Sequence, residues 1–329
     1  MEQLRFIDLF CGIGGFHIAA RNVCREREIQ PICVFSSDID PDCQITYEAN
    51  FHQKPAGDIC KVEASDIPDH DILFGGFPCQ PFSIIGSRLG FDDTRGTLFF
   101  EIARILDAKR PRAFILENVK QLAGHNKGET LKRIMEKLHF LGYHADYRVF
   151  NALNFGVPQK RERVFIVGFR EPTAFSWPRV NIAMRPLEDI LEAEVPDFYY
   201  ASDKIQASRL AKRDKIVEKR TIWHENKGGH ISAYPYSCAL RAGASYNYLL
   251  VDGERRLTER EMLRLQGFPE DYQIVCGYSA MRKLTGNSVA IPAVEAVIRS
   301  VLNAMYQPAH LPLRPPQAIL LERPATFAI

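Results

Sequence analysis

The feature of this sequence that most restricts its fold is a regular alternation of β-rich runs with helical patterns over the first 170 residues. Such alternation is typical of a parallel sheet covered by helices on both faces. The β-rich runs lie at 5–9, 32–36, 71–74, 112–116, 144–149 and 163–169. The helical patterns lie at 16–27, 42–50, 98–108 and 130–141, and Gly142 is placed to end the last of them. The sequence therefore predicts a doubly wound, mostly parallel α/β fold.

The alternation ends near Trp177, where prolines become frequent and clear periods are few. We expect a first domain at 1–189 and a smaller, irregular second domain at 190–280. The segment 281–329, with an amphipathic helix over 291–306, would return to the first domain. Within the second domain, residues 204–220 hold seven Lys or Arg and two acidic residues. This pattern alone fits either a solvated helix face or a nucleic-acid surface.

Composition narrows the class of protein. A hydrophobic content of 46% is enough for a large core, and a net charge of +2 favours no particular partner. The eight cysteines contain no C-x-x-C pair, which argues against a zinc site or a disulfide framework. No run of about 18 apolar residues and no signal-like start is present, so we expect a soluble, cytoplasmic protein without a membrane partner, a monomer by default.

A glycine-rich turn follows the first predicted strand, in the segment Phe6-Ile7-Asp8-Leu9-Phe10-Cys11-Gly12-Ile13-Gly14-Gly15-Phe16. Glycines at this position let the backbone approach a ligand closely. Asp38, just after the second strand, is placed to accept hydrogen bonds from ribose hydroxyls. Because the full G-x-G-x-x-G fingerprint is absent, the pattern favours a nucleoside cofactor without a pyrophosphate.

Two further strand ends carry reactive side chains. Cys79 lies in Gly75-Gly76-Phe77-Pro78-Cys79-Gln80-Pro81-Phe82-Ser83, held between two prolines, and Glu117-Asn118-Val119 ends the fourth strand. A loop thiol without function and a carboxyl that only caps a helix are the plain alternatives. Because the carboxyl ends of the strands share one crevice, we expect a thiol and a carboxyl beside the cofactor turn.

Two more polar segments lie near predicted strands or helices. In Gln159-Lys160-Arg161-Glu162-Arg163, the two arginines alternate and would face one side of a strand, where they could hold a carbonyl or phosphate oxygen. An ordinary salt-bridge ladder is the alternative. Gly286-Asn287-Ser288-Val289 precedes the last predicted helix and could return to the cofactor site.

In this order, the segments resemble the C5-cytosine DNA methyltransferase family, in particular its compact bacterial restriction-modification members. The resemblance covers residues 5–170 and 254–300 and also includes Arg256-Leu257-Thr258 and Leu265-Gln266-Gly267-Phe268-Pro269. It implies a class I methyltransferase fold, S-adenosyl-L-methionine as cofactor, double-stranded DNA as substrate, and a cognate restriction endonuclease as a further partner. The irregular region then corresponds to the family's target-recognition domain.

The resemblance also implies a role for each matching residue. Cys79 would add to C6 of a flipped cytosine, Glu117 would reach N3 and Arg163 would bind O2. The residues implied as catalytic are Cys79, Glu117, Arg161 and Arg163. Those implied to bind the cofactor are Phe10, Gly12, Gly14, Asp38, Ile39, Asp58, Ile59, Pro78, Leu98, Asn287 and Val289. Those implied to bind DNA are Gln80, Ser83, Arg95, Lys227, His230, Leu240 and Arg241, and no metal is implied.

The sequence departs from the family in two places and leaves other functions to consider. Ile39 stands where many members have an aromatic residue, and Ala239-Leu240 stands where a Thr and a small aliphatic residue are common. A tRNA cytosine methyltransferase would share the catalytic motifs, but its relatives carry a Cys-Phe-Thr tripeptide that is absent here. A NAD-dependent dehydrogenase would leave Cys79 and Glu117 unexplained, and a non-catalytic DNA-binding relative should have lost the thiol.

Overall fold

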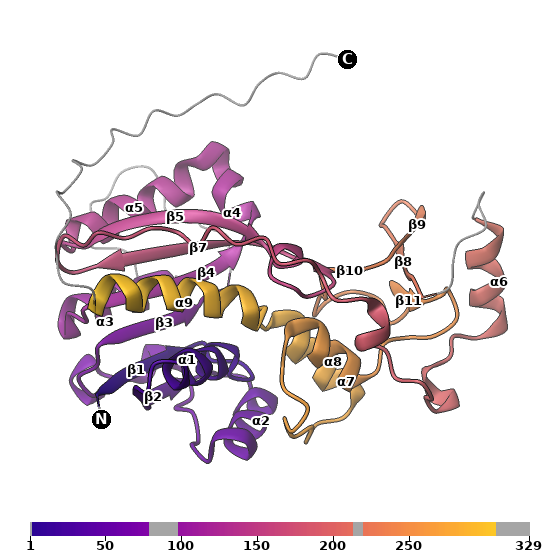
Figure 1. The fold of residues 1–329 in the computed structure, drawn as a ribbon, viewed down its shortest axis with the longest axis horizontal. Helices are drawn as coiled ribbons and strands as arrows, with labels where there is room; N and C mark the ends of the chain where they lie inside the picture. Colours follow the sequence, from indigo (N-terminus) through magenta and orange to yellow (C-terminus); the bar gives the residue numbers. More distant parts are fainter. Residues whose placement is uncertain (1, 79–97, 213–219, 307–329) are drawn as a thin grey trace.

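A six-stranded sheet forms the centre of the larger part of the molecule (Figure 1). The structure is a computed structural model that describes residues 2–78, 98–212 and 220–306. The strands, in the spatial order β2-β1-β3-β4-β7-β5, are β2 (Gln30–Ser37), β1 (Gln3–Leu9), β3 (Ile72–Gly76), β4 (Ala113–Val119), β7 (Glu162–Phe169) and β5 (His144–Asn151). The helices around it are α1 (Gly15–Arg25), α2 (Pro41–Phe51), α3 (Leu98–Lys109), α4 (Gln121–Gly124), α5 (Glu129–Phe140) and α9 (Ile291–Tyr306). This arrangement confirms the predicted α/β class.

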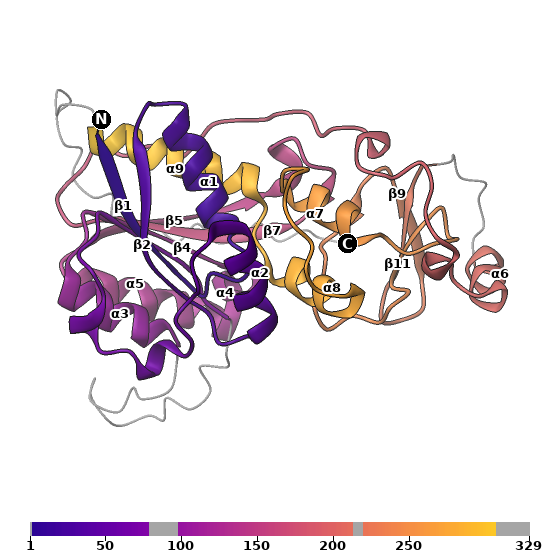
Figure 2. The ribbon, with the colours of Figure 1, turned by 90° about the horizontal axis from the view of Figure 1, so that it is seen from below.

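Both faces of the sheet are buried, and the side chains alternate between them as strand geometry requires. Phe6 and Ile115 pack in the apolar cluster beneath α1 and α9, whereas their neighbours Ile7 and Phe114 pack in the cluster beneath α3 and α5. Figure 2 shows α1 and α9 on one side of the strands and α3 and α5 on the other. Burial on two faces explains why the strands are continuous apolar runs rather than alternating patterns.

The sheet differs from a fully parallel one at β7, which runs antiparallel to both β4 and β5. Only residues 152–161 join β5 to β7, and they hold the short 3₁₀ turn Ala152–Asn154 and the two-residue strand β6 (Gln159–Lys160). A parallel crossover needs a dozen or more residues, usually with a helix. The short connection therefore forces the chain to return antiparallel.

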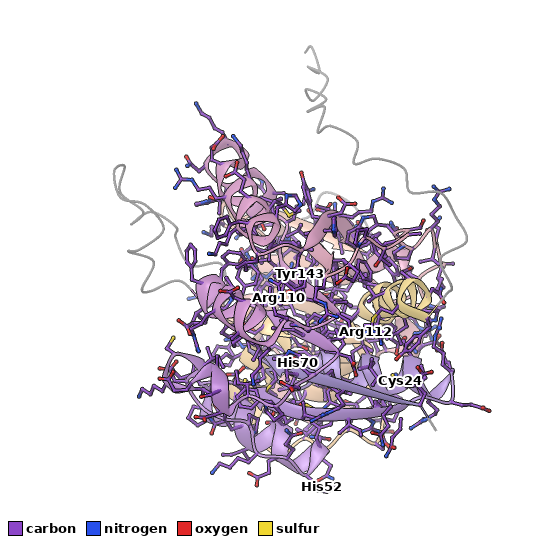
Figure 3. All side chains as sticks on the ribbon, turned by 90° about the vertical axis from the view of Figure 1, so that its left-hand side faces the viewer. Cys24, His52, His70, Arg110, Arg112 and Tyr143 are labelled. Carbon is purple, nitrogen blue, oxygen red and sulfur yellow. The ribbon has the colours of Figure 1, made fainter. Side chains whose placement is uncertain are left out.

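The end of α5 shows how local chemistry sets the geometry of the sheet. Gly142 has φ +81°, its N–H donates to the carbonyl of His139, and Tyr143 N–H donates to that of Leu138. These two backbone hydrogen bonds form a Schellman motif, so the predicted helix end at Gly142 is confirmed. The hydroxyl of Tyr143 donates to Pro111 O at 3.1 Å, and Arg110 lies over its ring at 5.7 Å (Figure 3).

The chain also contains a long apolar stretch at its carboxyl end. The two helices α8 (Tyr278–Asn287) and α9 within Tyr278–Tyr306 are together long and apolar enough to cross a membrane, but 61% of the relevant window is buried inside the protein. Val294, Ile298 and Val301 of α9 pack in the same cluster as α1. The stretch therefore behaves as a core helix of a globular fold.

A smaller part of the molecule, on the right of Figure 1, has its own apolar cluster. Its three-stranded sheet has the order β11 (Leu249–Val251), β8 (Ile222–Glu225) and β9 (Ile231–Tyr234). β10 (Ser237–Cys238) pairs with β6, and the helices are α6 (Asp203–Ala211) and α7 (Glu259–Gln266). Helix α7 begins with a capping box in which the side chains of Thr258 and Glu261 each accept the other's backbone N–H.

A stability prediction follows from the contact between β7 and β4. A Cβ on Gly168 would lie 2.3 Å from the ring of Phe114, which is fully buried. We expect Gly168→Ala to lower the free energy of unfolding by about 1–3 kcal/mol, because the ring has no space to move into. Gly124→Ala is the control, since a Cβ there meets no atom within 4 Å. Equal Tm values for the two variants would contradict this packing argument.

Candidate active site

A cavity of about 820 Å³ opens at the carboxyl ends of β1 to β4, where doubly wound folds bind ligands. Its walls come from the glycine turn, the segments after β2 and β3, the end of β4, the turn before β7, residues 240–243 and the end of α8. The lining includes these predicted site residues: Phe10, Gly12, Asp38, Ile39, Asp58, Ile59, Pro78, Leu98, Glu117, Arg161, Arg163, Leu240, Arg241 and Asn287.

The glycine turn contributes Phe10 and Gly12 to the wall of the cavity. Gly12 has φ +53°, and its N–H donates to Asp38 Oδ2 at 2.8 Å, while Asp38 Oδ1 accepts the N–H of Asp40 at 2.9 Å. A Cβ on Gly12 would meet no atom within 4 Å, so the glycine leaves open space rather than a packed contact. Phe10 also has a left-handed backbone, with φ +56°, a strained conformation that is common at functional sites.

The wall beside this turn alternates polar and apolar groups in a way that fits a nucleoside. Asp38 supplies a carboxylate, Ile39 is 70% exposed and supplies an apolar surface, and the carboxylate of Asp58 accepts the N–H of Cys60 at 3.0 Å. Carboxylates suit ribose hydroxyls or an exocyclic amine, and an aliphatic face suits a base. The residues present therefore fit the cofactor that the resemblance implies.

Two residues expected to contact the cofactor do not line the cavity. Gly14 is the N-cap of α1, and a Cβ there would lie 2.2 Å from the ring of Phe51. Val289 is buried against Gly15, where an added Cβ would lie 2.6 Å from its side chain. Both positions therefore pack against neighbouring side chains beside the glycine turn, and their direct contact with a cofactor stays a prediction.

A buried ion pair between Glu117 and Arg163 lines the same cavity. Arg163 Nε is 2.8 Å from Glu117 Oε1, and both side chains are largely buried. Burial raises the pKa of Glu117, although Arg163 and Arg161 oppose the rise. The site thus holds a carboxyl that gains its proton more readily than an exposed one, next to a guanidinium that faces the same space.

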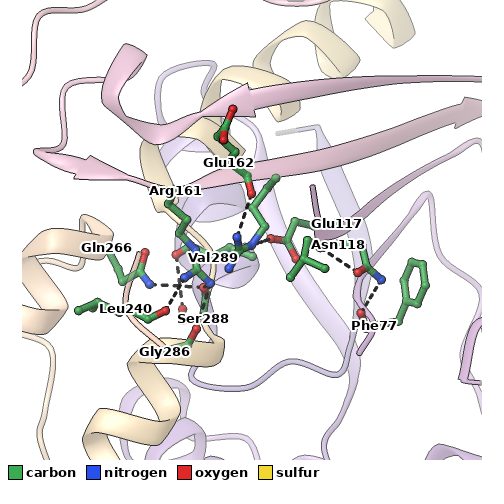
Figure 4. A network of polar contacts seen from close by, with 12 residues as sticks. Phe77, Glu117, Asn118, Arg161, Glu162, Leu240, Gln266, Gly286, Ser288 and Val289 are labelled. Carbon is green, nitrogen blue, oxygen red and sulfur yellow. Dashed lines mark hydrogen bonds and ion pairs between the residues drawn. The ribbon is translucent and has the colours of Figure 1, made fainter. Parts of the chain in front are cut away.

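Arg161 has a different role from its neighbour. Its guanidinium donates to the carbonyls of Leu240 and Gly286, each at 3.1 Å, and also to that of Ser288. These bonds join the turn before β7 to two distant segments that also line the cavity, as Figure 4 shows. Arg161 is therefore a positioning residue, and its expected contact with a substrate oxygen stays a prediction.

A comparison with protein families identifies the family of this chain. The model of the family described as C-5 cytosine-specific DNA methylase matches residues 4–303. This chain is a C-5 cytosine-specific DNA methylase. The match includes the glycine turn, the Glu117–Arg163 pair and the α8–α9 segment that lie together in the structure. The enzyme is accordingly a DNA cytosine-5 methyltransferase.

Individual relatives of this methylase agree with the family. It is 54% identical over 303 residues to the Type II methyltransferase M.NgoBI of Neisseria gonorrhoeae, covering 91% of this chain and 93% of that protein. It is 51% identical over 308 residues to the Type II methyltransferase M.HaeII of Haemophilus aegyptius, covering 93% and 95%. The crystal structure of the S. pombe Dnmt2 methyltransferase has the same fold, with a TM-score of 0.70, 22% identity and coverage of 92% and 100%.

Two buried amides of the methylase were not predicted to matter. Gln159 Nε2 donates to Leu265 O at 2.8 Å, and its Oε1 accepts the N–H of Leu240 at 3.1 Å. Gln266 Nε2 donates to Thr285 O at 2.7 Å. These amides tie the turn before β7 to α7 and α8. Both amides stand in segments that the family resemblance includes, but the sequence analysis assigned no role to either side chain.

Asn118 is a third positioning residue that sequence reasoning did not single out. Its Nδ2 donates to the carbonyl of Phe77 at 2.9 Å, two residues before Cys79. Cys79, Gln80, Ser83 and Arg95 themselves lie outside the described residues. Asn118 therefore fixes the path of the chain as it leaves β3 toward the predicted nucleophile.

The remaining predicted DNA contacts are divided between two places. Lys227 and His230 are exposed on the loop between β8 and β9, and neither lines the cavity, whereas Leu240 and Arg241 do. The basic run at 204–220 is partly paired within the protein. Its described cations are Lys204, Arg209, Lys212 and Arg220; of these, Arg209 and Lys212 pair with Glu225, and Arg220 pairs with Glu188.

Proposed function

We propose that this methylase flips a cytosine out of duplex DNA and methylates its C5 through a transient bond between the Cys79 thiolate and C6. The observation that carries the proposal is that the buried Glu117–Arg163 pair lines the same cavity as Asp38, Ile39 and Asp58, whose side chains suit a nucleoside. Inside a duplex, C6 is covered by stacked neighbours, so the base must leave the helix at a cost of a few kcal/mol.

The residues of the cavity divide the chemistry between them. C5 of cytosine is a weak nucleophile until a thiolate adds to C6 and converts the ring to an enamine. That addition places negative charge on the ring. A protonated Glu117 donates to N3, and Arg163 donates to O2, so both offset the charge where it develops. The raised pKa of Glu117 supports its acid role. Once C5 carries the methyl group, loss of the C5 proton to water breaks the bond between C6 and Cys79, which expels the thiolate and restores the aromatic ring.

The proposed cofactor is S-adenosyl-L-methionine, which supplies an electrophilic methyl group when bound. Asp38 would accept hydrogen bonds from the ribose, Ile39 and Ile59 would face the adenine, and Asp58 would accept from its amino group. Phe10, Gly12, Pro78, Leu98 and Asn287 complete the wall. The ion pair between Lys283 and Asp40, at 2.5 Å, braces this wall from α8.

Residues 190–280 are proposed to form the target-recognition domain, with 1–189 and 281–329 as the catalytic part. The proposed DNA contacts are Gln80, Ser83, Arg95, Lys227, His230, Leu240 and Arg241. M.NgoBI and M.HaeII are named Type II methyltransferases, which supports a role as the modification enzyme of a restriction-modification system. A cognate endonuclease that cuts the same site, a cytoplasmic location and a monomeric state belong to this proposal.

The test is methyl transfer from labelled S-adenosyl-L-methionine to duplex DNA, followed by mapping of the modified positions. We expect 5-methylcytosine at one cytosine within one short sequence, and no label on tRNA transcripts at the same concentration. Salt should weaken binding to all duplexes, because phosphate contacts release counterions. Label on tRNA but not on duplex DNA would overturn the proposal in favour of an RNA substrate.

A further inference from the structure

We infer that Arg241 reads a guanine in a base pair directly adjacent to the flipped cytosine. The inference rests on the proposed function and names one specificity contact within it. Arg241 follows Leu240 and lines the same cavity as Glu117 and Arg163. Arg241 therefore lies in the wall of the cavity that is proposed to hold the flipped base.

The segment that carries Arg241 is fixed to the catalytic part at its start. Gln159 Oε1 accepts the N–H of Leu240, and Arg161 donates to the carbonyl of the same residue. The N–H of Arg241 itself donates to the hydroxyl of Tyr248 at 2.9 Å. Because Arg161 and Arg163 lie two residues apart, the position of Arg241 relative to the Glu117–Arg163 pair is determined by short links.

The segment is also held farther along. Arg282 Nη1 donates to the carbonyls of Ala244 and Ser245, at 2.7 and 3.2 Å. Gly286 packs so closely against this segment that an added Cβ would lie 2.4 Å from Ala242 N. Residues 240–245 therefore form a support held from both ends, as recognition of a base edge requires.

The side chain of Arg241 is left available by these contacts. It is exposed, and no carboxylate of the described part of the chain pairs with it. Its Cζ lies 4.8 Å from the centre of the Tyr248 ring, and Tyr248 is buried. Contact with an immobile ring restricts the plane of the guanidinium before any ligand arrives.

A fixed, unpaired guanidinium fork matches one base better than the others. Guanine presents O6 and N7 side by side in the major groove, and an arginine donates to both at once. Adenine has a donor in place of O6, so it would face the fork unfavourably. Three other arginines of the same region are less available for a base, because each is already paired with a carboxylate: Arg209, Arg220 and Arg264.

The first experiment measures sequence preference. Wild-type enzyme methylates a duplex library with random bases around one cytosine, and sequencing of the methylated products gives the preference at each position. We expect a guanine requirement at one position next to the modified cytosine, on either strand. Arg241→Ala and Arg241→Lys should each relax that one requirement by about 10-fold to 100-fold and leave the other positions unchanged. The control is Arg299→Ala, which removes an arginine of α9 that pairs with Glu26. This variant should keep the wild-type profile.

A second experiment identifies the atom that is read. Replacing the preferred guanine by 7-deazaguanine removes N7, so wild-type methylation should fall while Arg241→Ala activity should not fall further. This non-additivity is the mark of a direct contact. An effect restricted to the guanine opposite the flipped cytosine would overturn the inference, as would an equal loss on all sequences, which indicates a phosphate contact. Absence of methylation by the wild-type enzyme would instead refute the proposed function itself.

Discussion

Replacing Cys79 by alanine is expected to lower the rate of methyl transfer by about 10⁴-fold or more. Without the thiolate, no bond forms at C6, and C5 keeps the low nucleophilicity of an aromatic ring carbon. Binding of DNA and cofactor should be nearly unchanged, because the contacts proposed for both come from other residues. The measurement is single-turnover transfer of a labelled methyl group, with DNA affinity determined in parallel.

Cys60→Ala is the matched control for this prediction. Cys60 lines the same cavity, but partial desolvation of its thiol and the nearby Asp58 raise its pKa, which leaves it a poor nucleophile. It should retain full activity. A duplex with 5-fluorocytosine at the target should trap wild type and Cys60→Ala but not Cys79→Ala, because fluorine at C5 leaves no proton to remove and the bond to C6 persists. Equal transfer by Cys79→Ala and wild type would refute the covalent mechanism.

The fold could be predicted from sequence where local patterns and burial agree. The runs at 5–9 and 112–116 became β1 and β4, and the pattern at 130–141 became α5 within one residue at each end. The antiparallel direction of β7 could not be predicted from periodicity, since a buried strand looks alike in both directions. Helix α7 could have been predicted, because Thr258 and Glu261 have the spacing of a capping box.

The residues of the candidate site likewise include some that the sequence could place and some that it could not. Strand ends share one edge of the sheet, so Asp38 and Glu117 could be placed beside the cavity from sequence alone. The bonds of Gln159 and Arg161 could not, because each joins segments about 80 or more residues apart, and nothing in the local pattern records such pairing. Ion pairing in the basic run was hidden from the sequence for a related reason, because the carboxylate partner of Arg209 lies in β8. A DNA contact of this run stays a prediction.

Glu117→Gln is expected to reduce methyl transfer by about 10²-fold to 10⁴-fold, the range typical of a lost general acid. Glutamine keeps the size of the side chain and can still accept from Arg163, so the pocket should remain folded. What it lacks is a proton that can pass toward N3 as charge develops on the ring. Wild-type and variant kcat values in single-turnover assays test the size of the effect, and Tm shows that the fold is intact.

The pH profile separates loss of the acid from a structural effect. Because the active form of Glu117 is protonated and burial raises its pKa, wild-type activity should hold below that pKa and fall as pH rises through it. This falling limb should be absent in Glu117→Gln, while the rising limb that reflects formation of the thiolate should remain. Glu162→Gln is the control: Glu162 pairs with Lys120 at 2.8 Å, does not line the cavity, and should keep both limbs. A falling limb that persists unchanged in Glu117→Gln would mean that another group supplies the proton to the ring.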